Sequence, residues 1–409
     1  MTSFAATLIA VSALVAASAL SGIAEAKVLS VAPGPEAQER LQTALLDAKP
    51  GDTVQLAAGR YDLTDGLSLD VDDVTIKGAG PAASILSFKG QKSAGEGLLI
   101  TSDRVTVRDF AVEDSRGDGI KSKGADEISF LNVRVEWTNG PNEKNGAYGV
   151  YPVASTNVLI DKVVVKGASD AGIYVGQSKN IILKNSRAEF NVAGIEIENS
   201  MNADVFDNVA THNAGGILVF DLPNLPVMGG HSHRVFNNQV IDNDTPNFAP
   251  KGNIVANVPT GTGIMVMANL NVHVFGNTIK GNQSTGIMLV SYTQTFTDKT
   301  YNPLPRDIVV RDNKIGRNGW NPQFKGGPMI AKMMGGTLPP VMWDGVTTFA
   351  GLPDVAKVRL SDGPVLNLNL PAPGQVDMAR PTVTKTVGDA VVTEPKPVIL
   401  PKRQAALGT

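Results

Sequence analysis

Short runs in which every second residue is apolar recur along the middle of the chain. The run GIYV at 172–175 recurs 22 residues later as GIEI at 194–197, and after another 22 as GILV at 216–219. Alternation of this kind predicts β-strands, because successive side chains of a strand point to opposite faces. The fixed short period predicts one structural unit stacked on copies of itself.

A unit of 22 residues has room for three strands of about five residues and three tight turns. Stacked units pair their strands in parallel and bury the Ile and Val columns inside. The sequence therefore predicts an all-β fold, a right-handed parallel β-helix, whose hand follows from the twist of L-residues. A ladder of stacked asparagines is also expected, since Asn favours turns and its amides pair between coils. The asparagines in one phase are Asn185 and Asn191, Asn208 and Asn213, Asn238 and Asn243, Asn277 and Asn282, and Asn313 and Asn318.

The two ends of the predicted solenoid differ in character from its middle. Residues 36–49 predict a helix with Leu41, Leu45 and Ala48 on one face, which would cap the open apolar end. From Trp320 the repeat fades, and Trp343 is expected to pack in a cap at the far end. The predicted organisation is a signal peptide at 1–26, a parallel β-helix with its N-terminal cap at 27–319, a C-terminal capping segment at 320–370 and a Pro-rich disordered tail at 371–409.

The N-terminus predicts export. Residues 5–24 are apolar, and Ala24-Glu25-Ala26 is a small-residue pattern that predicts cleavage after Ala26. An uncleaved anchor helix is the alternative, because residues 1–4 lack the usual Lys or Arg. No later stretch is apolar enough to span a bilayer, so the mature protein is expected in a periplasm or outside the cell.

Composition narrows the range of functions. The chain has no Cys, which excludes disulfides and covalently attached haem. Its formal net charge is −3, and no basic run with interleaved aromatic residues is present, so nucleic acid is not an expected partner.

Two stretches resemble known families. The run AKPGDTVQLAAGRYDL at 48–63, followed by DDVTIKGAG at 72–80, resembles the entry to the pectin-lyase-like fold. That resemblance implies a right-handed β-helix, often one that acts on acidic polysaccharides, although lyases, hydrolases, epimerases, binders and tail proteins share the fold. The stretches ILVFDLPNLPVMGGHSHRVFNN at 217–238 and PNFAPKGNIVANVPTGTGIMVMA at 246–268 resemble an exported parallel β-helix subfamily commonly encoded beside a dihaem c-type cytochrome. This second resemblance implies a possible cytochrome partner and no catalytic residue.

Breaks in the period predict long loops at 138–148, 221–234, 244–262 and 292–306. Two of them enter, and two leave, strands of the same row, so all four are expected to rise at the two ends of one strand face. Long loops around one face predict an exposed groove with a function. Decoration without a function is the alternative.

Strand parity gives the residues of that face. One outward column holds Lys121, Tyr151, Tyr174, Glu196, Leu218, Met265 and Met288, and a second holds Lys123, Glu198, Phe220 and Met267. Glu196 and Glu198 would face the same way about 7 Å apart, and such a pair suits calcium or shared acid and base roles. Lys121 or Tyr174 is the candidate base for a uronate C5 proton, as in a lyase or epimerase.

Further residues of this face are assigned to substrate binding: Tyr151, Lys123, Phe220, Asp221, Met265 and Met267. An ordinary solvated strand face is the alternative. The sequence has neither an Asp-Pro-His-Asp run of the mannuronan-epimerase kind nor the paired-Asp signature of a polygalacturonase.

A metal site is the remaining candidate. His231 and His233 form the only His pair, with Met228 near them in sequence, and imidazole with thioether suits copper. A solvated loop is the alternative there. The sequence thus predicts a protein with a groove for an acidic polysaccharide. Two other hypotheses remain: a cytochrome partner that docks on the Met and Phe patch, and an accessory role with a copper site.

Overall fold

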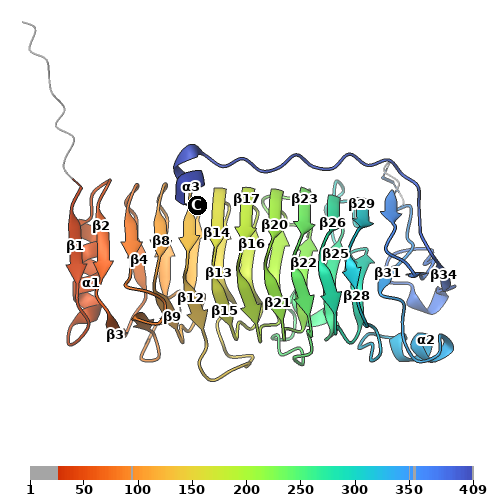
Figure 1. The fold of residues 1–409 in the computed structure, drawn as a ribbon, viewed down its shortest axis with the longest axis horizontal. Coiled ribbons are helices and arrows are strands. Elements are labelled where there is room, and N and C mark those ends of the chain that lie inside the picture. Colours follow the sequence, from red (N-terminus) through yellow and green to blue (C-terminus); the bar gives the residue numbers. More distant parts are fainter. Residues whose placement is uncertain (1–25, 94, 350, 353–355, 408–409) are drawn as a thin grey trace, which may run out of the picture.

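The computed structural model describes residues 26–93, 95–349, 351–352 and 356–407. The chain forms a right-handed parallel β-helix of three long sheets, and the predicted fold class is confirmed (Figure 1). Residues 1–25 of the signal peptide predicted at 1–26 lie outside the described residues. Among the helices that are described, none has the length and apolar character needed to cross a membrane.

The three sheets run the length of the solenoid, and we name them A, B and C. Sheet A contains β1 (Val28–Val31), β2 (Thr53–Leu56), β5 (Thr75–Lys77), β8 (Thr106–Arg108), β11 (Ser129–Leu131), β14 (Thr156–Asp161), β17 (Lys179–Lys184), β20 (Met201–Phe206), β23 (His231–Phe236), β26 (Leu270–Phe275), β29 (Arg306–Arg311) and β32 (Val358–Leu360). Sheet B contains β3 (Gly59–Asp62), β6 (Ser84–Ser87), β9 (Ala111–Glu113), β12 (Arg134–Glu136), β15 (Val164–Lys166), β18 (Arg187–Glu189), β21 (Val209–Thr211), β24 (Gln239–Ile241), β27 (Thr278–Lys280) and β30 (Lys314–Ile315). Sheet C contains β4 (Leu67–Leu69), β7 (Leu98–Ile100), β10 (Ile120–Lys123), β13 (Tyr148–Val153), β16 (Ala171–Gly176), β19 (Ala193–Glu198), β22 (Gly215–Phe220), β25 (Thr262–Met267), β28 (Thr285–Val290), β31 (Val341–Trp343), β33 (Val365–Asn367) and β34 (Thr382–Thr384).

One coil takes a strand from sheet C, then A, then B, as in β16, β17 and β18. Every strand pair is parallel except β33 with β34 among the described strands. The predicted Ile column is in register, because Ile173 pairs with Ile195 and Ile195 with Ile217, and all three are fully buried. Burial of these side chains supplies the hydrophobic stabilisation of the solenoid.

Two ladders of asparagine side chains run through the interior. Asn208 donates its amide to Asn238 Oδ1 (3.0 Å), and Asn191 donates to Asn213 Oδ1 (3.0 Å), with each ladder continuing coil by coil. The expected place of Asn185 in the ladder is wrong. Asn185 takes a left-handed backbone and donates to Asp161, whereas Ser186 occupies the ladder position and its backbone N–H donates to Asn208 Oδ1.

Helix α1 (Ala37–Asp47) covers the N-terminal end, as predicted, and packs against β1, β3 and β4. Leu41 and Leu45 are buried under it, so the helix closes the apolar end of the first coil. At the other end, β31 and β33 extend sheet C while β32 extends sheet A. Trp343 is buried in β31, in agreement with its expected packing role. The remaining helices are α2 (Gly327–Met333), α3 (Lys402–Leu407), and the 3-10 turns η1 (Ile254–Asn257) and η2 (Val376–Met378).

The C-terminal segment differs from the expected disordered tail. It runs back along the solenoid and ends with α3 beside the middle coils (Figure 1). Glu394 forms ion pairs with Arg234 (3.5 Å) and Arg311 (2.7 Å), and Gln404 donates to backbone oxygens of Ile128 and Asn157. The proline content of this segment predicted disorder. The segment makes few contacts with itself, but its specific contacts with sheet A hold it in place.

The four predicted loops are present at 137–147, 221–230, 242–261 and 291–305. The first and third lead from sheet B into sheet C, and the other two lead from sheet C to sheet A. All four therefore border sheet C, as the sequence predicted.

Candidate functional site

The outer face of sheet C carries the residue column that the sequence predicted. Lys121 pairs with Tyr151 in register at one end. Tyr174 pairs with Glu196, which pairs with Leu218, and the column continues through Met265 and Met288. The second column is also confirmed, since Glu198 pairs with Phe220 and Phe220 with Met267.

The prediction that this face is an exposed surface is wrong for most of its length. Tyr174 is 4%, Glu196 1% and Phe220 0% exposed. The loops fold down onto the face: Asn253 of the 242–261 loop donates to Asp170 Oδ2 (2.9 Å), and the Val227 N–H donates to Gln177 Oε1 (3.3 Å). The face opens only towards Tyr151 and Lys121, which are partly exposed, and Lys123, which is exposed.

Three tyrosines form one cluster at the open end. The rings of Tyr148, Tyr151 and Tyr174 lie with their centroids 4.4–4.9 Å apart. Sequence parity missed Tyr148, because residues three apart lie on opposite faces of a regular strand. The contact between the Tyr148 and Tyr151 rings shows that β13 is irregular near Gly149, and that glycine was the available signal.

Three carboxyl groups lie beside the tyrosines. Tyr174 donates its O–H to Glu198 Oε1 (2.6 Å). Burial raises the pKa of Glu198 to about 7 against the Tyr174 hydrogen bond, with the charge of Asp221 adding to the rise. Burial likewise raises the pKa of Asp170 to about 7, helped by the charge of Glu198 and opposed by the hydrogen bond from Asn253.

Glu196 is the most enclosed of the three. Burial, together with the charges of Glu198 and Asp170, raises the pKa of Glu196 well above its ordinary value. Its Oε2 is buried and, among the described residues, has no hydrogen-bond partner. An unpaired buried carboxyl oxygen is costly, so this atom is where a ligand group would gain most.

Neither predicted base is placed to accept a proton. Lys121 is held by Glu96 (2.9 Å) and Asp118 (3.3 Å), and its ammonium lies 4.8 Å from the Tyr151 ring centre. Burial lowers the pKa of Lys121, but the hydrogen bond to Glu96 and the two carboxylate charges outweigh it, so the net pKa is raised. Burial raises the pKa of Tyr174 well above its ordinary value, which keeps the phenol protonated.

Asp221 lies on the far side of Glu198. It accepts a hydrogen bond from the Gly230 N–H (2.7 Å), and burial raises its pKa to about 6. It borders a cavity of about 410 Å³ whose wall includes Met228, Tyr301 and Arg306. The sequence assigned Asp221 to substrate binding, and the structure places it at the edge of this cavity.

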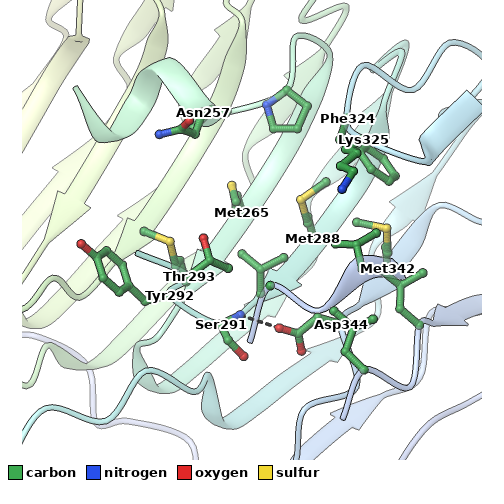
Figure 2. Close-up of a pocket in the computed structure, with 18 of the residues that line it drawn as sticks. Asn257, Met265, Met288, Ser291, Tyr292, Thr293, Phe324, Lys325, Met342 and Asp344 are labelled. Atoms are coloured by element: carbon green, nitrogen blue, oxygen red, sulfur yellow. Dashed lines mark hydrogen bonds between the residues drawn. The ribbon is translucent and has the colours of Figure 1, made fainter. Parts of the chain in front are cut away.

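A second cavity, of about 290 Å³, continues along the same face (Figure 2). Its floor holds four methionines, Met265, Met267, Met288 and Met342, three of which are consecutive in register. Phe220 and the η1 turn close the side next to the carboxyl groups. The far wall comes from the part of the chain after the repeat fades, with Phe324, Leu368 and Val376 among its residues. Without a period there, the position of this wall was not predictable.

The structure places the predicted metal ligands in a different setting from the expected loop. His231 and His233 lie on β23 of sheet A rather than in a loop. His233 is fully buried between Ala203 and Val272, and burial lowers its pKa to about 3. For calcium, the raised pKa values of Glu196 and Glu198 favour the protonated forms, and the described residues include no group of three or more His, Cys, Asp or Glu placed to hold a metal ion.

Comparisons with known proteins bear on the fold. A family model described as "Right handed beta helix region" matches residues 73–244. No curated protein sequence gives a significant match. Among solved structures, the chain is similar to the mannuronan C-5 epimerase AlgE6 A-module of Azotobacter vinelandii, with 16% identity, a TM-score of 0.50, and 79% of this chain and 87% of that chain covered. It is also similar to an alginate lyase from Paenibacillus sp. str. FPU-7, with 18% identity, a TM-score of 0.40, and 72% of this chain and 96% of that chain covered. The family model and the similarity to the epimerase module agree with the right-handed parallel β-helix fold.

Proposed function

We propose that the outer face of sheet C binds a polysaccharide and transfers protons on it. The observation that carries this proposal is Glu196, a buried carboxyl group with an unpaired oxygen, two residues from Glu198, whose pKa is about 7. Titratable groups with pKa values near the working pH are efficient in proton transfer. The adjoining tyrosine rings offer the apolar surface on which sugar rings stack.

The roles follow from the environments of the carboxyl groups. Glu198, ionised in part near neutral pH and oriented by Tyr174, is the proposed base. Glu196 stays protonated and donates its proton to the carboxylate of a uronate, which stabilises the charge that develops when C5–H is broken. The resulting carbanion has two alternative fates. Either the C4–O4 bond breaks, O4 takes a proton from water and an unsaturated sugar is formed, or a proton from water adds to the opposite face of C5 and gives the epimer.

An acidic polysaccharide is the proposed substrate class. The fold shared with a mannuronan epimerase module supports it. When its carboxyl groups are ionised, the acidic cluster would repel a polyuronate. When they are protonated, they donate hydrogen bonds to the polyuronate instead. Lys121 supplies a cation at the open end of the face. Export is proposed with it, since such polymers lie outside the cytoplasm and Ala24-Glu25-Ala26 has the pattern of a cleavage site.

The cytochrome-partner hypothesis gains no support from the residues assigned to it. Phe220, Met265 and Met267 are buried beneath loops and form a cavity wall rather than an exposed patch.

Incubation with alginate, pectate and related polyuronates tests the proposal. Absorbance of unsaturated products and the NMR ratio of epimers are the readouts, with Glu198→Gln as the inactive variant. Glu189→Gln is the matched control, because Glu189 is a similarly buried glutamate on sheet B. Silence on every polymer, together with no retention on immobilised polyuronate, contradicts the proposal.

A further inference from the structure

The methionine-lined cavity has no part in the proton transfer proposed above. We propose that it binds an alkyl or aryl substituent carried by the polysaccharide substrate, so that the natural substrate is amphiphilic. This inference rests on the proposed function for the identity of the polar part. The apolar site itself can be tested separately.

The wall of the cavity is chemically suited to an apolar group. Besides the four methionines, it is formed by side chains such as Phe220, Ile254, Val258 and Leu370. Unbranched thioether side chains repack around ligands of different shape. The volume of about 290 Å³ is roughly twice that of a dry apolar cavity known to accept benzene.

The polar groups in the wall leave little for a polar ligand to bind. Asp344 accepts hydrogen bonds from the Ser291 N–H (2.6 Å) and the Val346 N–H (3.1 Å), and the first of these is drawn in Figure 2. Ser291 Oγ is buried and has no hydrogen-bond partner among the described residues, so it offers a ligand a single hydroxyl group. Asn257 and Lys325 lie on the opposite side of the cavity in Figure 2, away from Asp344.

The cavity lies next to the carboxyl cluster on the same sheet, with Phe220 between them. Phe220 pairs in register with Glu198 on one side and with Met267 on the other. Two strand spacings separate Glu198 from Met267, which is about 10 Å. The 242–261 loop spans both sites as well, with Asn253 bonded to Asp170 while Ile254 lines the cavity. A substituent that is attached to the polymer within about two sugar units of the reacting ring would therefore reach the methionines.

Methionine-methyl NMR on the full protein tests this inference, with octyl β-D-glucuronide and methyl β-D-glucuronide as probes. We expect the octyl compound to shift the signals of the four cavity methionines and to bind at least tenfold more tightly than the methyl compound. Met329 and Met333 are exposed, so their signals serve as internal controls that stay in place. Loss of one signal in Met288→Leu assigns that resonance.

A cavity-filling variant sharpens the test. Val290→Phe should abolish the tenfold preference for the octyl probe while it leaves the affinity for the methyl probe unchanged, and Met333→Phe should change neither. Equal affinity of the two probes for the wild-type protein overturns the inference. A soft metal ion is the competing occupant of a site lined by thioethers, so the inference is also overturned if the cavity methionine signals shift with Ag⁺ but not with the octyl probe. If the octyl probe binds but Glu198→Gln does not change the rate of reaction with polyuronates, the apolar site is retained and the proposed function is rejected. The two failures are therefore distinguishable.

Discussion

Sheets B and C each bury glutamates on their outer faces to almost the same extent, and the two sets have opposite electrostatics. Glu189 on sheet B is 7% exposed and Glu198 on sheet C is 8% exposed. Burial acts to raise both pKa values, but hydrogen bonds from Lys166 and Arg187 lower the pKa of Glu189 below its ordinary value. Glu198 accepts a hydrogen bond from the Tyr174 phenol and lies near the charge of Asp221, and burial raises its pKa to about 7.

The comparison shows that solvent exposure alone does not decide what a carboxyl group can do, because its partners and its depth in the protein both set its pKa. A paired carboxylate is stable in its ionised form and holds two coils together. An acid without a cationic partner is unstable when ionised, and that instability lets it exchange protons near neutral pH. Glu113, held by Arg60 and Arg134, repeats the sheet B pattern on another coil.

The largest expected effect separates the two glutamates by function. Glu198→Gln should reduce the rate on a polyuronate by about 100-fold or more, because the proposed base is lost. Glu189→Gln should leave the rate within about twofold. It should cost roughly 1–2 kcal/mol of stability, since a carboxylate with partly exposed cationic partners is removed. Initial rates and urea unfolding measure both. A large loss of activity in Glu189→Gln would contradict the distinction.

The second prediction concerns stability and pH. Because the pKa of folded Glu198 lies above that of the unfolded chain, the native state binds more protons between about pH 4.5 and 7, and stability should fall as pH rises through that window. Glu189 acts in the opposite direction, since its lowered pKa gives stability above the unfolded pKa that is lost as pH falls. Urea unfolding at pH 5 and 7.5 should show a smaller decrease for Glu198→Gln than for wild type. An equal decrease in both proteins speaks against the raised pKa.

The third prediction tests the only hydrogen bond that opposes the rise in the pKa of Glu198. Tyr174→Phe removes the O–H that favours the carboxylate, so the pKa of Glu198 should increase further. The acidic limb of the pH–rate profile should move to higher pH by up to about one unit, and the plateau rate should fall by about tenfold. A profile that keeps its position would mean that Tyr174 does not orient the base.

The smallest effect is expected at the loop that covers the cluster. Asn253→Ala removes the hydrogen bond that lowers the pKa of Asp170. Because Asp170 acts on Glu198 only through its charge, we expect the rate at neutral pH to change by less than about threefold. Asn257→Ala, in the same turn but without a bond to the cluster, is the control. A change larger than that of Tyr174→Phe would assign Asp170 a direct role.

Much of the scaffold was predictable from the sequence, because a solenoid converts a period directly into register. The spacing of the Gly-Ile motifs placed Tyr174, Glu196 and Leu218 in one column, and breaks in that spacing located the four loops. The asparagine ladder was predicted apart from Asn185, where a serine fills the position one period earlier.

The environment of the site was not predictable in the same way. A period says where a loop leaves the solenoid but not which way it folds, so the burial of Glu196 and the closure of the methionine cavity were missed. Asp170 lies outside the alternating part of its strand, and Tyr148 is reached only through an irregular step. The HxH motif led to the opposite error, a predicted site without support in the structure. In sequence it resembles a pair of metal ligands, but His233 occupies a buried position inside the solenoid.

Titration of ¹³C-labelled glutamate carboxyl groups by NMR, assigned with Glu198→Gln and Glu189→Gln, tests the central claim most directly. Glu198 should titrate near pH 7, and Glu189 should titrate below the ordinary pKa of a glutamate. A Glu198 carboxyl that titrates at or below the pKa of Glu189 would contradict the account.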